Sequence, residues 1–157
     1  MEEQKSRVND YEEFLGQTLG EALLEPTRIY VKPVMEMLDS GIDLKAMVHI
    51  TSGGFCNLNR VECDNIRFVI DTLQPVPEIF NLIQDRGGVS EAEMFEVFNM
   101  GTGFCLVVEG TNEVEAVTEI CKNNDLSCQL IGQVEGCQGK EVSLPQKQLT
   151  GKGSRFT

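Results

Sequence analysis

Long apolar runs, histidine, closely paired cysteines and basic residues are all scarce in this sequence. No stretch approaches the run of about 18 apolar residues that a membrane-spanning helix needs, and we expect no signal peptide. His49 is the only histidine, and no C-x-x-C pair occurs, so a typical zinc site and a Ser/His/Asp or Cys/His catalytic group find no support. No G-x-x-x-x-G-K-[ST] phosphate loop is present either. The sequence thus argues against a membrane-spanning protein and against these catalytic and nucleotide-binding classes.

Acidic residues dominate the charge. The 157 residues include 25 Asp and Glu against 13 Lys and Arg, a net charge of −12. Nucleic acid and anionic membranes reward basic surfaces, so neither is expected as the main partner, although backbone amides can still hold a small phosphorylated ligand. Two of the six cysteines, Cys105 and Cys121, fall in apolar patterns where a thiol acts as a small hydrophobe. We therefore expect reduced thiols and a cytoplasmic protein.

The length and the 41% hydrophobic content predict one domain with a real core. Residues 1–17 are charged and weakly periodic and are interpreted as an interdomain linker or tail. The domain is expected to span residues 18–146, followed by a flexible tail over residues 147–157.

Apolar patterns predict alternating strands and helices between these ends, and hence a sheet with helices packed on it. Pro33 fits the first turn of its helix, Ser90 and Glu93 form a capping box, and Thr111 is expected to cap the last helix. The predicted strands cover residues 29–31, 46–50, 66–70, 104–108, 129–134 and 141–144. The predicted helices cover residues 32–39, 77–86, 91–99 and 111–122.

Thr51, Ser52, Gly53 and Gly54 follow a predicted strand and open a predicted helix. Paired glycines let the backbone approach a ligand, and free N–H groups attract anions, but a tight strand-to-helix turn needs the same residues. His49 lies two residues before this loop and is either an acid–base group or a buried core histidine.

Two further segments leave alternatives open. Asn99, Met100 and Gly101 lie between a helix and a strand, and either end the helix or supply donors at a cleft. Thr27 and Arg28 precede a predicted strand, where the guanidinium fork suits a phosphate or is simply a surface charge.

Several segments together carry a family resemblance. In order they are T-L-G-E-A-L-L-E-P-T-R-I-Y-V-K-P-V (18–34), H-I-T-S-G-G-F (49–55), N-x-x-R-V (57–61), V-P-E-I-F (76–80), G-G-V (87–89), E-M-F-E-V-F-N-M-G-T-G (93–103) and I-G-Q-V (131–134). Their order and spacing resemble the C-terminal domain of the phosphoribosylformylglycinamidine cyclo-ligases, also called aminoimidazole ribonucleotide synthetases. The resemblance covers roughly residues 18–144.

The resemblance implies an α+β fold, a layered α/β/α domain with a mixed sheet that is partly ferredoxin-like. It implies a ligase of de novo purine synthesis that converts formylglycinamidine ribonucleotide to aminoimidazole ribonucleotide with ATP and Mg²⁺. In the family an N-terminal domain supplies most ATP and metal ligands, so we expect this chain to be one half of such an enzyme. Alone it should neither turn over substrate nor bind ATP well. The full enzyme is expected to be a homodimer, and the chain alone a monomer or weakly associated, exposing the apolar face that meets the N-terminal half.

The resemblance also suggests site residues, with no metal ligand among them. His49 is the candidate catalytic or substrate-orienting group, and Thr27 and Arg28 are expected near the substrate phosphate. The loop Thr51, Ser52, Gly53 and Gly54 should cradle an anion, and Asn99, Met100 and Gly101 should flank the same cleft. The family most often has glycine where this chain has Ser52, which leaves the detail of the anion site open.

Two other functions stay open. Related ATP-dependent enzymes, such as selenophosphate synthetase, thiamine-monophosphate kinase and the hydrogenase maturation factor, share the two-domain plan but generally lack P-T-R-I-Y-V-K. The other alternative is a stand-alone, non-catalytic binding module.

Overall fold

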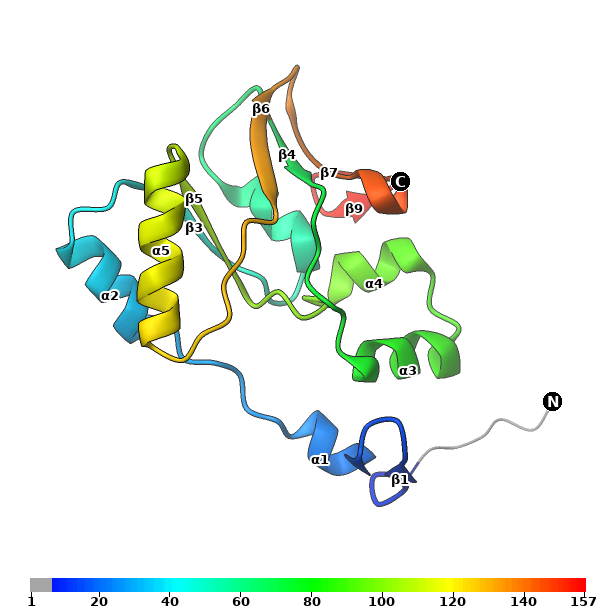
Figure 1. Ribbon diagram of the computed structural model, residues 1–157. Helices are drawn as coiled ribbons and strands as arrows, with labels where there is room; N and C mark the ends of the chain where they lie inside the picture. Colours follow the sequence, from blue (N-terminus) through cyan, green and yellow to red (C-terminus); the bar gives the residue numbers. More distant parts are fainter. Residues whose placement is uncertain (1–6) are drawn as a thin grey trace.

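A computed structural model describes residues 7–157, and Figure 1 shows the chain. No helix within this range is long and apolar enough to cross a membrane. The helices are α1 (Leu19–Leu23), α2 (Val31–Asp39), α3 (Glu78–Gly87), α4 (Glu91–Val97), α5 (Thr111–Asn123) and two 3₁₀ helices, η1 (Gly54–Arg60) and η2 (Pro145–Lys147). The strands are β1 (Tyr11–Glu12), β2 (Gln17–Thr18), β3 (Leu44–His49), β4 (Ile66–Ile70), β5 (Phe104–Val108), β6 (Gly132–Gly136), β7 (Lys140–Leu144), β8 (Leu149–Lys152) and β9 (Arg155–Phe156).

Besides the small β1–β2 hairpin, the described residues form two sheets. β3 pairs antiparallel with β5, while β6, β4, β7, β8 and β9 form a five-stranded sheet in that order. This larger sheet is mixed, because β4 runs parallel to β7 and antiparallel to β6. The alternation of side chains gives the β3–β5 ribbon two apolar faces. One face carries Leu106 and Val108 toward α2 and α5, which lie side by side in Figure 1.

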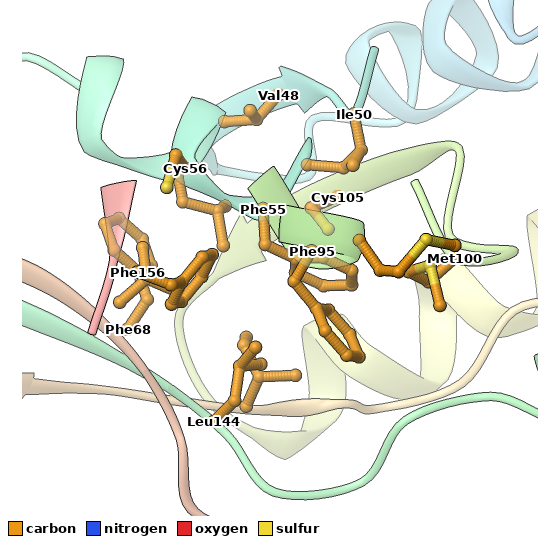
Figure 2. Packing of buried hydrophobic residues seen from close by; sticks show 14 residues of the cluster. Val48, Ile50, Phe55, Cys56, Phe68, Phe95, Met100, Cys105, Leu144 and Phe156 are labelled. Carbon is orange, nitrogen blue, oxygen red and sulfur yellow. The ribbon is translucent and has the colours of Figure 1, made fainter. Parts of the chain in front are cut away.

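The other face of the β3–β5 ribbon meets the main core. Val48 of β3 and Cys105 of β5 pack there with Phe55 of η1 and Phe95 of α4, as Figure 2 shows. β4 and β7 add buried residues from the five-stranded sheet, among them Leu144, which is fully buried. η1 and α4 are therefore packed between the β3–β5 ribbon and the five-stranded sheet, and this packing fixes the loop that precedes η1.

Most predicted elements are confirmed. β4 and β5 have the predicted bounds, and α2, α3 and α4 differ from prediction by one or two residues at their ends. The Ser90 hydroxyl caps α4 by accepting from the Glu93 N–H at 3.3 Å. The predicted cap at Thr111 is wrong, since Gly110 is the N-cap of α5 and Thr111 its first helical residue.

The strand predicted over residues 29–31 is wrong. Ile29 is 78% exposed, and Val31 already begins α2. β-branched residues favour a strand only where a partner strand and a packing surface exist, and Ile29 lies on no such surface.

The flexible tail predicted over residues 147–157 is also wrong. β8 pairs with β7, and β9 pairs with β8 around the two-residue turn Gly153–Ser154. Phe156 is 5% exposed and belongs to the main core, as Figure 2 shows. The side chain of Asn59 ties this hairpin to η1 by donating to the carbonyl oxygens of Gly151 and Gly153. Because the Phe156 ring is buried and β8 and β9 are both hydrogen-bonded to a neighbouring strand, this segment is part of the folded domain.

The predicted linker over residues 1–17 lies partly outside the described residues, because residues 1–6 are not among them. From residue 7 onward the chain forms the β1–β2 hairpin, seen below α3 in Figure 1. Glu12, 8% exposed, accepts two hydrogen bonds from Arg86 of α3, at 2.6 and 2.8 Å. The hairpin is therefore fixed to α3, and its role as a link to another domain stays a prediction.

Candidate functional site

Three rings meet where β3 ends. His49 is the last residue of β3 and lies opposite Phe104, the first residue of β5. Tyr30, the residue before α2, stacks on Phe104 with ring centroids 5.0 Å apart. The ring of Tyr30 meets that of His49 edge-on at 5.8 Å. His49 itself is exposed, so its imidazole is held beside an aromatic wall and open to solvent.

The fit of Tyr30 depends on Gly103. A Cβ on Gly103 would lie 2.0 Å from the Tyr30 hydroxyl oxygen, so only glycine leaves room for the phenol. Burial raises the pKa of Tyr30 above its ordinary value, and the nearby charge of Arg28 opposes this shift. Tyr30 is therefore a neutral phenol at physiological pH, and Arg28 lies within electrostatic range of it.

The glycine loop follows His49 after one buried residue, Ile50. Gly53 and Gly54 both have positive φ, +101° and +51°, a conformation that glycine adopts without strain. A Cβ on Gly54 would lie 2.0 Å from the carbonyl oxygen of Phe95 and 2.8 Å from that of Phe98. The loop backbone therefore packs directly on the C-terminal end of α4.

Asn57 of η1 connects this loop to His49. Its side chain is 2% exposed, and Nδ2 donates to the carbonyl oxygen of His49 at 3.2 Å. A Cβ on Gly53 would lie 2.6 Å from Asn57 Oδ1. Among residues 7–157, Oδ1 has no hydrogen-bond partner. A buried amide oxygen without a protein partner needs a physical explanation, and Oδ1 of Asn59 and Asn124 and Oγ1 of Thr102 share this state.

The 99–103 segment forms the neighbouring wall. The Asn99 side chain accepts from the Gly101 N–H at 3.0 Å, and the Thr102 N–H donates to the Asn99 carbonyl at 2.8 Å. The Ile50 N–H donates to the Gly103 carbonyl at 2.9 Å, which joins this turn to the start of the glycine loop. The Met100 side chain is 6% exposed and points into the core, as Figure 2 shows, so Met100 can serve a site only through its backbone.

Thr27 and Arg28 lie in the stretch between α1 and α2, and both are exposed. Neither side chain makes a hydrogen bond or ion pair with another of residues 7–157. Arg28 is linked to His49 only indirectly, because its charge acts on the pKa of Tyr30 and the Tyr30 ring contacts the His49 ring. The structure therefore joins His49, the glycine loop and residues 99–103, and it leaves Thr27 at the margin.

A cavity of about 220 Å³ lies elsewhere, between the β3–β5 ribbon, α5 and the chain leading into β6. Tyr30 and Phe104 form one wall of this cavity, and none of its lining residues is Asp, Glu, Lys, Arg or His. An apolar space without charge does not suit a phosphate group. Nor do three or more His, Cys, Asp or Glu side chains gather anywhere in the described part of the chain in a way that could hold a metal ion.

Sequence reasoning missed three residues of this region. They are Tyr30, Asn57 and Arg60, the last of which has its Nη2 atom 3.4 Å from the Cβ position of Gly53. All three stand inside segments that carried the family resemblance, P-T-R-I-Y-V-K and N-x-x-R-V. The signal was present, but neither pattern shows that these side chains converge on the glycine loop and on His49.

Comparison with known proteins places this fold in a family. A model of the C-terminal domain of AIR synthase related proteins matches residues 2–145, and the chain belongs to this family. Curated relatives are named phosphoribosylformylglycinamidine cyclo-ligase. The relative from Methanocaldococcus jannaschii is 44% identical over 132 residues, 83% of this chain and 37% of the relative. The relative from Bacillus licheniformis is 47% identical over 123 residues, 77% of this chain and 35% of the relative.

A third relative of that name, from Alkaliphilus metalliredigens, is 42% identical over 150 residues, which is 93% of this chain and 42% of the relative. The chain thus spans less than half the length of these relatives and resembles their C-terminal portion.

Proposed function

We propose that this chain is the C-terminal half of an ATP-dependent cyclo-ligase that closes the imidazole ring of aminoimidazole ribonucleotide from formylglycinamidine ribonucleotide. The observation that carries the proposal is the similarity to cyclo-ligases over 93% of the chain, together with a folded loop beside the only histidine. The layered, partly ferredoxin-like arrangement of the family and a cytoplasmic location belong to the same proposal.

In this proposal the chain binds and orients the substrate. His49 is an exposed imidazole beside the rings of Tyr30 and Phe104, and Asn57 binds its backbone carbonyl, so it is placed at the edge of the loop as an acid–base group. The loop Thr51, Ser52, Gly53 and Gly54 offers backbone N–H groups to an anion. Orienting a flexible substrate for an intramolecular attack is itself a large catalytic contribution.

The remaining candidates extend this surface. Arg28 would bind the substrate phosphate with its guanidinium fork, with Thr27 beside it. Asn99, Met100 and Gly101 would flank the substrate, with the Asn99 amide and the backbone facing it. The aromatic rings of Tyr30 and Phe104 contact the His49 ring and would hold it beside the substrate.

ATP and Mg²⁺ are proposed to bind mainly through the N-terminal half. Mg²⁺ takes oxygen ligands, chiefly carboxylates, and the described residues bring no such cluster together. These residues therefore do not by themselves fit a metal–nucleotide site, and no step of the proposed role depends on one here. The partner half would close over the loop, and the complete enzyme is proposed to be a homodimer.

A chimera tests the proposal. This chain replaces the matching C-terminal part of the M. jannaschii relative, and ATP-dependent formation of aminoimidazole ribonucleotide is measured. Product formation is expected from the chimera and not from either half alone. A folded chimera without product, beside an active parent enzyme, would contradict the proposal. If the chimera does not fold, the two halves are mixed as separate chains and assayed in the same way, and absence of product from two folded halves also counts against it.

The role of His49 is tested in the same chimera. His49→Ala should lower kcat by about a hundredfold or more, the usual range for a lost acid–base group. Met47→Ala is the matched control, because Met47 is exposed on the same side of β3 and has no titratable group. Equal turnover in the two variants removes His49 from the proposed role.

A further inference from the structure

Two free thiols lie together at the end of α5. Cys121 stands in the last turn of α5 and is 7% exposed. Cys128 follows in the chain that leads toward β6, and it is half-buried. Cys128 packs against the hydrophobic cluster that Cys121 forms with Met37 of α2 and with Val117 and Ile120 of α5. The two thiols therefore share one small apolar environment.

The backbone turns sharply at this point and brings Cys128 back toward α5. The N–H groups of Asn124 and Leu126 both donate to the Cys121 carbonyl, at 3.0 and 2.9 Å. Asp125, between them, has a positive φ of +56°. Because this turn is anchored on the Cys121 carbonyl, Cys128 lies only two residues beyond a backbone hydrogen bond to its partner cysteine.

The contact between the thiols changes the chemistry of Cys121. Burial raises the pKa of the Cys121 thiol well above its ordinary value, and Cys128 raises this pKa further by its charge and a hydrogen bond. In Cys105, by contrast, burial alone raises the pKa. Cys121 is therefore a poor nucleophile toward an oxidant in solution, and Cys128 is the member of the pair that an oxidant meets first.

A cavity gives small molecules access to the pair. Cys121 and Cys128 both line the space of about 220 Å³ between the β3–β5 ribbon, α5 and the chain leading into β6. Leu130 also lines this space and is 62% exposed, so the cavity reaches the surface close to Cys128. A water molecule occupies about 30 Å³ in the liquid, so a hydroperoxide with a few heavy atoms fits inside.

We propose that Cys121 and Cys128 are a redox modification site, at which a hydroperoxide converts the two thiols to one reversible disulfide. The Cys128 thiolate attacks a peroxide oxygen, the O–O bond breaks, and the departing oxygen takes up a proton and leaves as water or an alcohol. Cys128 is then a sulfenic acid. The Cys121 sulfur attacks the Cys128 sulfur, the S–O bond breaks, and the hydroxide leaves as water with the proton of Cys121. The electron pair that the two thiols lose reduces the peroxide, and a dithiol reverses the oxidation by thiol–disulfide exchange.

This site is separate from the proposed substrate surface. Cys121 and α5 pack on the face of the β3–β5 ribbon that carries Leu106 and Val108, whereas η1 and the glycine loop lie on the other face. The inference therefore does not depend on whether the chain is half of a cyclo-ligase.

The test is treatment of the full chain with hydrogen peroxide at low protein concentration, followed by alkylation of the remaining thiols in urea. Trypsin and a glutamate-specific protease then place the cysteines on separate peptides, since they cut after Lys122, between the pair, and after Glu135, before Cys137. Mass spectrometry should find peptides 120–122 and 123–135 joined by a disulfide, and should find them separate after reduction with dithiothreitol. This joined pair should outnumber any other disulfide by about tenfold or more, because the folded chain holds its two thiols together.

Cys128→Ser and Cys137→Ser are a matched pair of variants. Both cysteines are half-buried, but Cys137 donates to the Gly139 carbonyl at 3.5 Å and lies outside the cluster around Cys121. Cys137→Ser should form the disulfide like the wild type, whereas Cys128→Ser should leave Cys121 reduced and open to alkylation in urea. In Cys121→Ala the reaction should stop at the sulfenic acid of Cys128, which dimedone traps. Circular dichroism of each variant establishes that it is folded.

The inference is overturned if the folded wild-type chain gives no joined 120–122 and 123–135 peptides. Pairing of Cys128 with Cys63 or with a second chain, in place of Cys121, also contradicts it. So does oxidation of Cys121 in folded Cys128→Ser to the same extent as in the wild type, because Cys121 would then react without its neighbour.

Discussion

Replacing Gly54 with alanine should destabilise the chain by about 2–5 kcal/mol. Part of this loss, about 1–2 kcal/mol, is the strain of a Cβ at φ +51°. The larger part comes from contact with a backbone that cannot rotate away, because the Cβ would lie 2.0 Å from the Phe95 carbonyl oxygen. Relieving such overpacking moves η1 away from α4 and typically costs about 1–3 kcal/mol. Domains of this size have about 5–15 kcal/mol of stability in all, so the variant should be marginal.

Gly88→Ala separates the two contributions. Gly88 has nearly the same φ, +59°, but nothing within 4 Å of its Cβ position, so it carries the strain without the contact. Urea unfolding followed by circular dichroism gives the free energy of unfolding of each variant by linear extrapolation. Gly54→Ala should lose at least about 1 kcal/mol more than Gly88→Ala, with an unchanged slope. Equal losses would show that η1 yields freely and that α4 does not fix the loop.

Three further results are expected. Gly103→Ala should change stability by less than about 1 kcal/mol, since a flexible phenol moves aside, but ring-proton NMR shifts should show displaced aromatic rings at the site. Hydrogen bonding from Arg67 lowers the pKa of Glu141, so the ionised pair stabilises the fold above about pH 4.5, and this stability is lost as the pH falls further. In Glu141→Gln the free energy of unfolding should therefore depend less on pH in the acid range. The same acid dependence in the variant and the wild type would refute this. Burial raises the pKa of Cys105 to about 12, so at pH 8 mass spectrometry should find iodoacetamide on exposed Cys63 and none on Cys105 in the native chain.

Local pattern was enough for elements whose burial is continuous along the chain. The runs at 66–70 and 104–108 are rich in β-branched and aromatic residues, bounded by polar or glycine residues, and both form strands with the predicted bounds. Gly41 and Gly88 lie directly after the ends of α2 and α3, and both have the positive φ that glycine supplies where a helix ends.

Long-range pairing explains what the pattern missed. Ile29 resembles a strand residue, but no strand lies beside it, and the polar end of the chain became two strands because β7 offers it an open edge. The G-K-G-S stretch that begins at Gly151 ends β8 and makes the turn into β9 at Gly153 and Ser154. Neither outcome can be read from a window of ten residues.

At the candidate site too, the sequence predicts which residues are neighbours along the chain but not which contacts hold them in place. The sequence identified the glycine loop and His49 as neighbours because they adjoin in the chain, and the structure adds what holds them together. Asn57, eight residues beyond His49, binds its carbonyl, and the carbonyls at the end of α4 leave no space for a side chain at Gly54. Both contacts lie within this chain, so they hold the loop in its shape without a contact from a partner domain. A loop fixed in this way loses little conformational entropy when an anion arrives, and free phosphate should therefore bind to the chain alone.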